Sequence, residues 1–157
     1  MSTEIEQLNK QDKEILLRAP SLVAISAAIS DDGKVSKQEK AQSIKLAQLR
    51  TYTAHPILHN YYKEVDKVFA EYFEEILADL PEDWKGKEVY IKEKLIAINE
   101  VIPKLNEVYA RHLVSSLKSF ARHVFNSNSS FLEYFILPIF LDQIEKKSFN
   151  TGIKDLE

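Results

Sequence analysis

Apolar residues recur along most of the chain at intervals of three and four positions, the spacing of one face of an α-helix. The 157 residues include only three glycines and few β-branched runs, so a sheet is not favoured. We therefore predict an all-α fold, a single-domain multi-helix bundle of about six to seven helices. The domain is expected to span residues 1–157, with frayed tails at 1–10 and 148–157.

Four helices are predicted in the first half. A short helix covers 12–18, and Pro20 opens a second over 21–30, because the first turn of a helix does not need the N–H that proline lacks. This second helix, SLVAISAAIS, is apolar or small on every side, which is typical of a central, buried helix. A third is expected from Ser36 to about Arg50, and a fourth from Pro56 to about Leu80.

The predicted fourth helix has a marked apolar face, which we expect to be core rather than a cofactor site. Its members are Tyr62, Val65, Phe69, Phe73, Ile76 and Leu80.

The second half resumes a helical stripe from Lys87, which Pro103 interrupts. The stripe continues in phase beyond the proline, so one kinked helix and two abutting helices both fit, and we favour a kink or break at Ile102. A last helix is expected from about Phe131, bent by Pro138.

The stretch ISDDGKVSKQE joins the second and third predicted helices. Ser36 followed by Glu39 fits a capping box, in which each side chain accepts a hydrogen bond from the other residue's backbone N–H. With Gly33 as the sixth position of a calcium loop, Ala28 and Ser30 fall at the first and third, so the first-position Asp that anchors the ion is missing. A standard EF-hand is therefore not predicted.

This stretch resembles the helix, Asp-Gly turn, helix signature of the tellurite-resistance TerB-like family, in the positions Asp32, Gly33, Val35, Ser36 and Glu39. The resemblance covers roughly residues 15–80. It implies an all-helical bundle, acidic side chains that hold divalent cations, and a non-catalytic accessory role in stress resistance. The second Asp-Gly-Glu signature of many family members is replaced here by NSNSSFLE, in which Glu133 is the only acid.

We take Asp31, Asp32 and Glu39 as candidate metal ligands, for calcium or magnesium. Such cations need six or more oxygens, so carbonyls, water or another helix would have to complete the site. The alternative is a purely architectural turn, because glycine accepts a left-handed conformation and Ser36 with Glu39 is explained by capping.

The sequence contains few candidate residues for catalysis or for a transition-metal site. His55 and His59 share a helix face, but no third histidine joins them and a solvated or capping role is favoured over zinc. No histidine has a glutamate three residues before it, as bundle di-iron sites require. We therefore predict that the protein is not an enzyme and has no cofactor other than the cation.

The charge pattern argues against nucleic acid as a partner. The formal net charge is −3, and a basic stripe at near seven-residue intervals is expected to form an intramolecular or subunit salt-bridge network, with an acidic flank as a candidate partner. The stripe comprises Lys104, Arg111, Lys118 and Arg122, and the flank comprises Glu71, Glu74 and Glu75.

The longest apolar run, YFILPIFL, is far shorter than the ~20 residues that span a bilayer. We expect the surrounding segment to pack on the central helices, with a homodimer or protein-partner interface as the alternative and membrane docking last. The absence of cysteine and of an export signal favours a cytoplasmic protein.

The leading functional hypothesis is thus a cytoplasmic, non-catalytic TerB-like binding or stress-response accessory protein with a weak cation site at the turn. The alternative is a structural interaction or dimerisation module that uses its carboxy-terminal apolar helix and has no metal site.

Overall fold

The computed structural model describes residues 4–32 and 35–125. Regular structure in these ranges is entirely helical, which confirms the all-α prediction for them. The α-helices are α1 (Lys10–Asp32), α2 (Lys37–Thr53), α3 (His59–Asp79), α4 (Trp84–Val101) and α5 (Glu107–Phe125), and the 3₁₀ helices are η1 (Ile5–Gln7), η2 (Pro56–Leu58) and η3 (Ile102–Lys104). The helix predicted from Phe131 and the tail 148–157 lie outside the described residues, so the total of six to seven helices stays a prediction.

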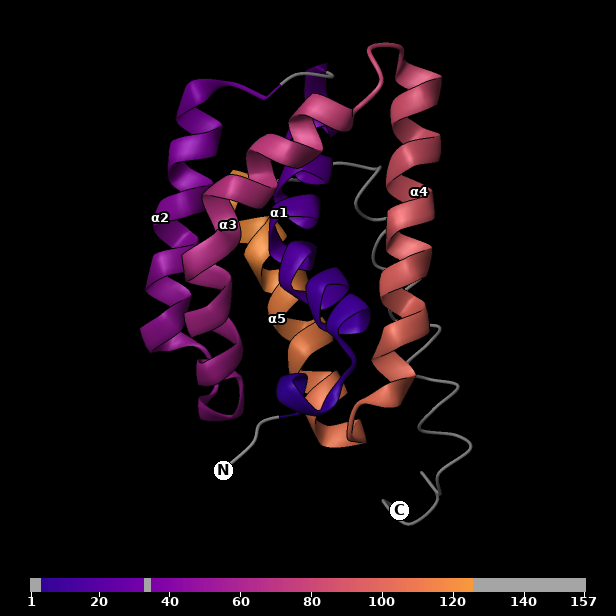
Figure 1. The fold of residues 1–157 in the computed structure, drawn as a ribbon. Coiled ribbons are helices and arrows are strands. Elements are labelled where there is room, and N and C mark those ends of the chain that lie inside the picture. Colours follow the sequence, from indigo (N-terminus) through magenta and orange to yellow (C-terminus); the bar gives the residue numbers. More distant parts are fainter. Residues whose placement is uncertain (1–3, 33–34, 126–157) are drawn as a thin grey trace, which may run out of the picture.

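Helix α1 lies at the centre of the molecule, between α2 on one side and α4 on the other (Figure 1). It packs against α3, α5 and α4, while α2 packs mainly on α3. From Ala19 to Ile29, every residue whose burial is described is buried. The prediction of a central helix is confirmed for this stretch, and its apolar side chains belong to one continuous core.

Pro20 lies inside α1, so the prediction of two separate helices over 12–18 and 21–30 is wrong. Proline has no N–H to donate to the carbonyl four residues earlier, which is that of Leu16. The hydroxyl of Tyr61 on α3 donates to this Leu16 carbonyl at 2.7 Å. A side chain 45 positions away therefore satisfies the carbonyl that Pro20 leaves without a backbone donor, and the helix continues.

Helix α3 confirms the apolar stripe predicted for it. Tyr62, Val65, Phe69, Phe73 and Ile76 are all buried, and Leu80, just past the helix end, is half-buried. The Phe69 ring lies close to the rings of Phe73 and Phe120. These aromatic residues are core, as expected.

The helical stripe is interrupted at Ile102, next to Pro103, as favoured from the sequence. Helix α4 ends at Val101, η3 follows over Ile102–Lys104, and α5 begins at Glu107. Oδ1 of Asn106 accepts from the backbone N–H of Val108 at 2.9 Å, which helps to satisfy the free donors at the start of α5.

Part of the predicted amino-terminal tail is packed on the bundle. Residues 5–7 form η1, and Ile5 is 1% exposed within the core. A side-chain oxygen of Glu4 accepts from the backbone N–H of Asn106 at 3.4 Å. The frayed tail predicted over 1–10 is therefore wrong for this part, because burial of Ile5 holds it in place.

Candidate functional site

The α1–α2 turn holds the three candidate ligands. Asp31 and Asp32 are the last two residues of α1, and Glu39 is the third residue of α2. Residues 33–34, which include Gly33, lie outside the described ranges. The structure thus places the three residues on either side of one short connection, while their convergence on a cation stays a prediction.

Glu39 takes part in the predicted capping box, which is confirmed. The Ser36 backbone N–H donates to Oε1 of Glu39 at 2.8 Å, and the Glu39 backbone N–H donates to Oγ of Ser36 at 3.0 Å. The capping box fixes the start of α2 and holds one carboxylate oxygen of Glu39 on the backbone.

The end of α1 has an unusual charge pattern. A helix carries partial negative charge at its carboxy terminus, where lysine, arginine and histidine are favoured and acids are not. Here the last turn holds no basic residue and two acids. The two aspartates therefore lie at a position that the helix dipole disfavours.

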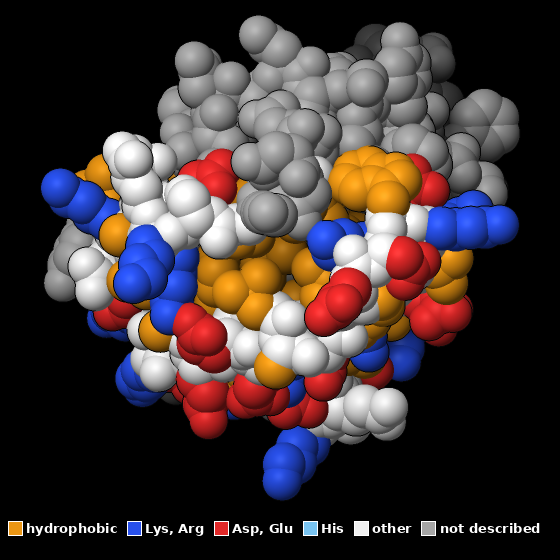
Figure 2. All heavy atoms as spheres, turned by 90° about the horizontal axis from the view of Figure 1, so that it is seen from above, with side chains coloured by type: hydrophobic (Ala, Val, Ile, Leu, Met, Phe, Trp, Pro, Cys, Tyr) orange, Lys and Arg blue, Asp and Glu red, His pale blue; other side chains and the backbone are white. Residues whose placement is uncertain are grey.

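At this end of the bundle, hydrophobic side chains are visible in a hollow between acidic and basic groups (Figure 2).

Among the side chains that the structure describes, which do not include those of Asp31 and Asp32, no group of three histidine, aspartate or glutamate residues is placed to hold a metal ion. His55 stacks on His112 with ring centroids 3.9 Å apart, and its Nδ1 accepts from the Ile57 backbone N–H at 3.2 Å. Nε2 of His59 lies 2.8 Å from the Ala54 carbonyl. The capping role predicted in place of zinc binding is confirmed for His55.

The acidic flank pairs with other cations than those predicted. Glu75 accepts from Arg18 of α1, and Glu74 pairs with Lys40 of α2. These two acids therefore do not serve as the candidate partners of the basic stripe, because α3 packs mainly on α1 and α2. Lys104 of the stripe instead pairs with the buried Asp12 at 2.6 Å, and Arg111 pairs with Glu107 at 2.7 Å.

A cavity of about 440 Å³ lies between α1, α3 and α4. Its wall is aliphatic at Ile15, Leu22, Ile76 and Ile98 and charged at the rim, where Arg18, Lys94, Glu14 and Asp79 balance one another.

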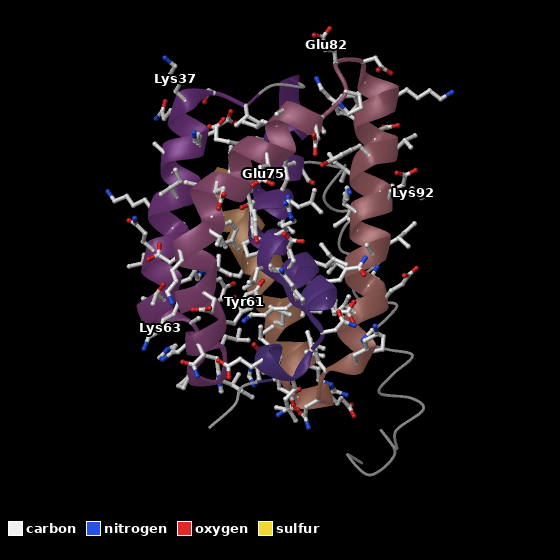
Figure 3. All side chains as sticks on the ribbon, in the orientation of Figure 1. Lys37, Tyr61, Lys63, Glu75, Glu82 and Lys92 are labelled. Carbon is white, nitrogen blue, oxygen red and sulfur yellow. The ribbon has the colours of Figure 1, made fainter. Side chains whose placement is uncertain are left out.

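Arg18 is the most strongly engaged group of this rim. Its Nη2 donates to Glu75 Oε1 at 2.6 Å, and the guanidinium lies 4.2 Å from the centre of the Tyr72 ring. Glu75 is labelled on α3 in Figure 3. Burial works to lower the pKa of Arg18, but the hydrogen bond and charge of Glu75, with Glu14, outweigh it and raise the pKa. Arg18 thus holds α1 to α3 and is not a free anion receptor.

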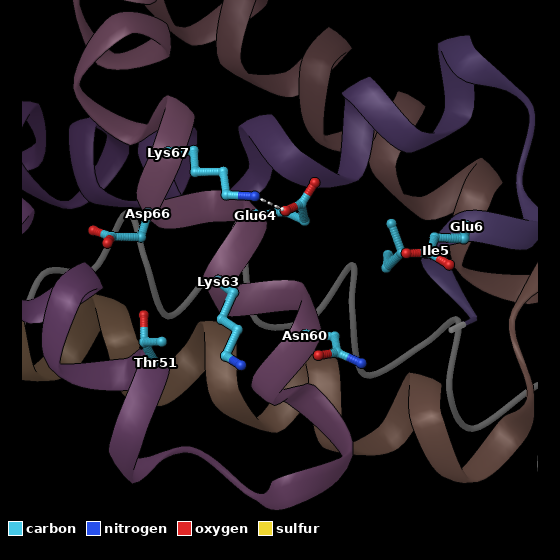
Figure 4. A pocket seen from close by; sticks show the side chains of 8 residues that line it. All are labelled: Ile5, Glu6, Thr51, Asn60, Lys63, Glu64, Asp66 and Lys67. Atoms are coloured by element: carbon cyan, nitrogen blue, oxygen red, sulfur yellow. Dashed lines mark hydrogen bonds and ion pairs between the residues drawn. The ribbon is translucent and has the colours of Figure 1, made fainter. Parts of the chain in front are cut away.

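A second cavity of about 380 Å³ lies along the outer side of α3 (Figure 4). Thr51, Lys63 and Asp66 line one part of it, and Ile5 and Glu6 line another. Glu64 accepts from Lys67 at 2.7 Å, and this hydrogen bond lowers the pKa of Glu64. Glu64 and Lys67 are thus paired along α3, and the residues that line this cavity include none of the predicted ligands.

Sequence reasoning missed the long-range pairs that tie the helices together. Asp12 and Lys104 are 92 positions apart, and Arg18 and Glu75 are 57 apart. Asp12 could have been singled out as a polar residue on the buried side of the helical pattern. That pattern does not indicate which basic residue pairs with Asp12.

Comparison with protein-family models, curated proteins and solved structures finds no match to the chain. The resemblance of the turn to the TerB-like signature therefore stays a prediction. In the ranges that the structure describes, every helix is too short or too polar to cross a membrane.

Proposed function

We propose that this protein is a non-catalytic, TerB-like helical binding module that takes a divalent cation, calcium or magnesium, at the α1–α2 turn. One observation carries the proposal: α1 ends on Asp31 and Asp32 with no basic residue in its last turn. An acid at the negative end of a helix costs roughly 0.3–1 kcal/mol. A bound dication turns that repulsion into attraction.

The turn supplies oxygen ligands of several kinds. Asp31 and Asp32 bring carboxylates, and the last four carbonyls of a helix have no intrahelical partner. Glu39 uses Oε1 to accept from the Ser36 N–H, and a carboxylate has lone pairs on both oxygens, so capping and coordination are compatible. Water completes the six or more positions that calcium and magnesium prefer.

The polar groups of the bundle support a scaffold for binding. Those that join separate elements hold the helices together, as in the pairs Asp12–Lys104, Arg18–Glu75 and Tyr62–Ser116. On α3, Glu75 pairs with Arg18 of α1 and Glu74 pairs with Lys40 near the start of α2, so α3 joins the two helices that flank the turn. The accessory role in stress resistance rests on the resemblance of the turn to the TerB-like signature.

Isothermal titration of the chelator-stripped full chain with calcium and magnesium tests the proposal. We expect saturable binding that Asp32→Ala abolishes and that Asp66→Ala, which removes an exposed aspartate from α3, leaves intact. Retention of the same binding by Asp32→Ala, or no binding by the unaltered protein, would contradict the proposal.

A further inference from the structure

Helices α4 and α5 each pack on α1 but scarcely meet one another along their lengths within the described residues. One flank of α5 faces α2 and η2: His112 stacks on His55, and Ser119 accepts from Arg50 at 2.9 Å. One flank of α4 faces the cavity shared with α3, through Tyr90 and Lys94. The opposite flanks of the two helices therefore point to the same side of α1.

Helical geometry identifies the residues of these opposite flanks, at 100° per residue. On α4 they include Lys92 and Asn99, and on α5 they include Arg111, Val114 and Lys118. We call these five residues the α4–α5 face. It has a buried part, since Asn99 is 8% and Val114 4% exposed, and a charged part formed by the three cations.

Asn99 adds a second observation. Its Oδ1 atom is buried and has no hydrogen-bond partner within the described part of the chain. A buried amide oxygen without a donor costs roughly 1–3 kcal/mol, so native structures usually supply a partner. The α4–α5 face thus calls for a segment that brings a hydrogen-bond donor together with apolar side chains.

We propose that residues 131–147 of the same chain dock on the α4–α5 face as a further helix, antiparallel to α5. Helix α5 ends at Phe125, and five residues then separate it from position 131, which is within the usual length of a connection between antiparallel helices. Seventeen helical residues extend ~25 Å, close to the ~28 Å of the 19-residue α5. The flank toward α2 is occupied, which leaves the α4–α5 face as the available neighbour.

The chemistry of the segment matches that face. Residues 131–147 contain three acids, Glu133, Asp142 and Glu145, and two basic residues, Lys146 and Lys147, at the carboxy-terminal end of the segment. The face presents Lys92, Arg111 and Lys118, of which Arg111 is also paired with Glu107. Apolar residues make up most of the remaining segment, and Tyr134 and Gln143 bring donors of the kind that the Asn99 oxygen lacks.

Engineered disulfides in the full-length chain test this docking, because the protein has no cysteine of its own. Lys92→Cys is combined in turn with a cysteine at Ile139, Phe140, Leu141 or Asp142, four positions that together sample every face of a helix. The matched control replaces Lys45, an exposed lysine of α2 on the far side of the molecule, and uses the same four partners (Figure 1). Both lysines are exposed, and each partner substitution occurs in both series, so any effect of that substitution on folding is shared by a Lys92→Cys pair and its Lys45→Cys control.

We expect at least one Lys92→Cys pair to form an intrachain disulfide at least tenfold faster than the same partner with Lys45→Cys. Docking brings the two Cα atoms within the ~7 Å that a disulfide requires. Equal rates with both lysine positions would overturn the proposal. Disulfides that join two chains, from the Lys92→Cys pairs, would also overturn it and would assign the face to a second copy of the protein.

Discussion

At the scale of single residues, Gly86 shows how a local contact reverses an intrinsic propensity. Gly86 lies near the start of α4, and its backbone N–H donates to a side-chain oxygen of the N-cap Asp83 at 2.8 Å. A Cβ atom at Gly86 would come within 2.7 Å of Asp83 Oδ1 and 2.8 Å of the Pro81 Cβ. The absence of a side chain therefore permits the cap.

We predict that Gly86→Ala lowers the free energy of unfolding by roughly 1–3 kcal/mol, the usual cost of overpacking. Helix propensity alone predicts a gain of about 1 kcal/mol. Urea unfolding distinguishes the two. Ala70→Gly, at an exposed position within α3, serves as the control and should show the ordinary propensity cost. A stabilised Gly86→Ala variant would contradict the steric argument.

Three buried tyrosines, Tyr61, Tyr62 and Tyr109, make the stability sensitive to alkaline pH. Burial raises the pKa of each above the ordinary value of 10.0. Above pH 10 the unfolded chain loses these protons while the folded protein keeps them, so the folded state binds more protons and the free energy of unfolding falls as pH rises.

We therefore expect that ionisation of these tyrosines does not affect the free energy of unfolding below about pH 9. Above pH 10 the free energy of unfolding should fall steeply. Parallel measurements of tyrosinate absorbance and helical content check this. The three buried tyrosines should ionise only as helicity is lost, and Tyr62→Phe should make the fall less steep. Ionisation of all seven tyrosines near pH 10 in a fully helical protein would count against it.

At the scale of elements, α1 and α3 are joined by the hydroxyl of Tyr61. This group donates to the Leu16 carbonyl that Pro20 leaves without its backbone donor. Tyr109, by contrast, is 2% exposed and its hydroxyl has no partner among the described residues. The two tyrosines are equally buried but differ in hydrogen bonding, which makes them a matched pair.

We predict that Tyr61→Phe costs roughly 1–3 kcal/mol of stability, because it leaves the buried Leu16 carbonyl unsatisfied. Tyr109→Phe should be neutral or stabilising, since it removes a buried hydroxyl that makes no hydrogen bond. In a Pro20→Ala background the backbone N–H returns, so the cost of Tyr61→Phe should shrink. Denaturant unfolding of this double-mutant cycle measures the coupling, and additive effects would refute the compensation.

The sequence predicted those structural features that depend on residues close together in the chain. The Ser36–Glu39 cap, the apolar stripe of α3 and the break at Pro103 each depend on residues a few positions apart. The continuation of α1 through Pro20 depends on Tyr61, and no local pattern reports a donor from another helix. Features set by neighbouring residues could therefore be predicted from the sequence, whereas a hydrogen bond from another helix could not.

At the scale of the whole molecule, the sequence indicated the central position of α1 but not the ion pairs that join α1 to other elements. The apolar stretch of α1 indicated its central position before the structure placed α3, α4 and α5 around it. The ion pairs Asp12–Lys104 and Arg18–Glu75 depend on which helices become neighbours, and composition cannot specify that. The candidate cation site is likewise readable only in its local part, Asp31, Asp32 and Glu39.

The stability of Asp32→Asn, with and without calcium, tests the central claim most directly. In chelator, the substitution removes a negative charge from the negative end of α1 and should raise the free energy of unfolding by roughly 0.3–1 kcal/mol. Saturating calcium stabilises a binding-competent chain by about 2.7 kcal/mol at 100 times its Kd. Calcium should therefore make the unaltered protein the more stable of the two.

Thermal unfolding of both proteins in chelator and in excess calcium measures this reversal, with Asp66→Asn on α3 as the control for general charge effects. Our account predicts that Asp32→Asn unfolds at a higher temperature than the unaltered protein in chelator and at a lower one in calcium. If Asp32→Asn keeps the same advantage in both conditions, the turn binds no calcium and is only a connection between two helices.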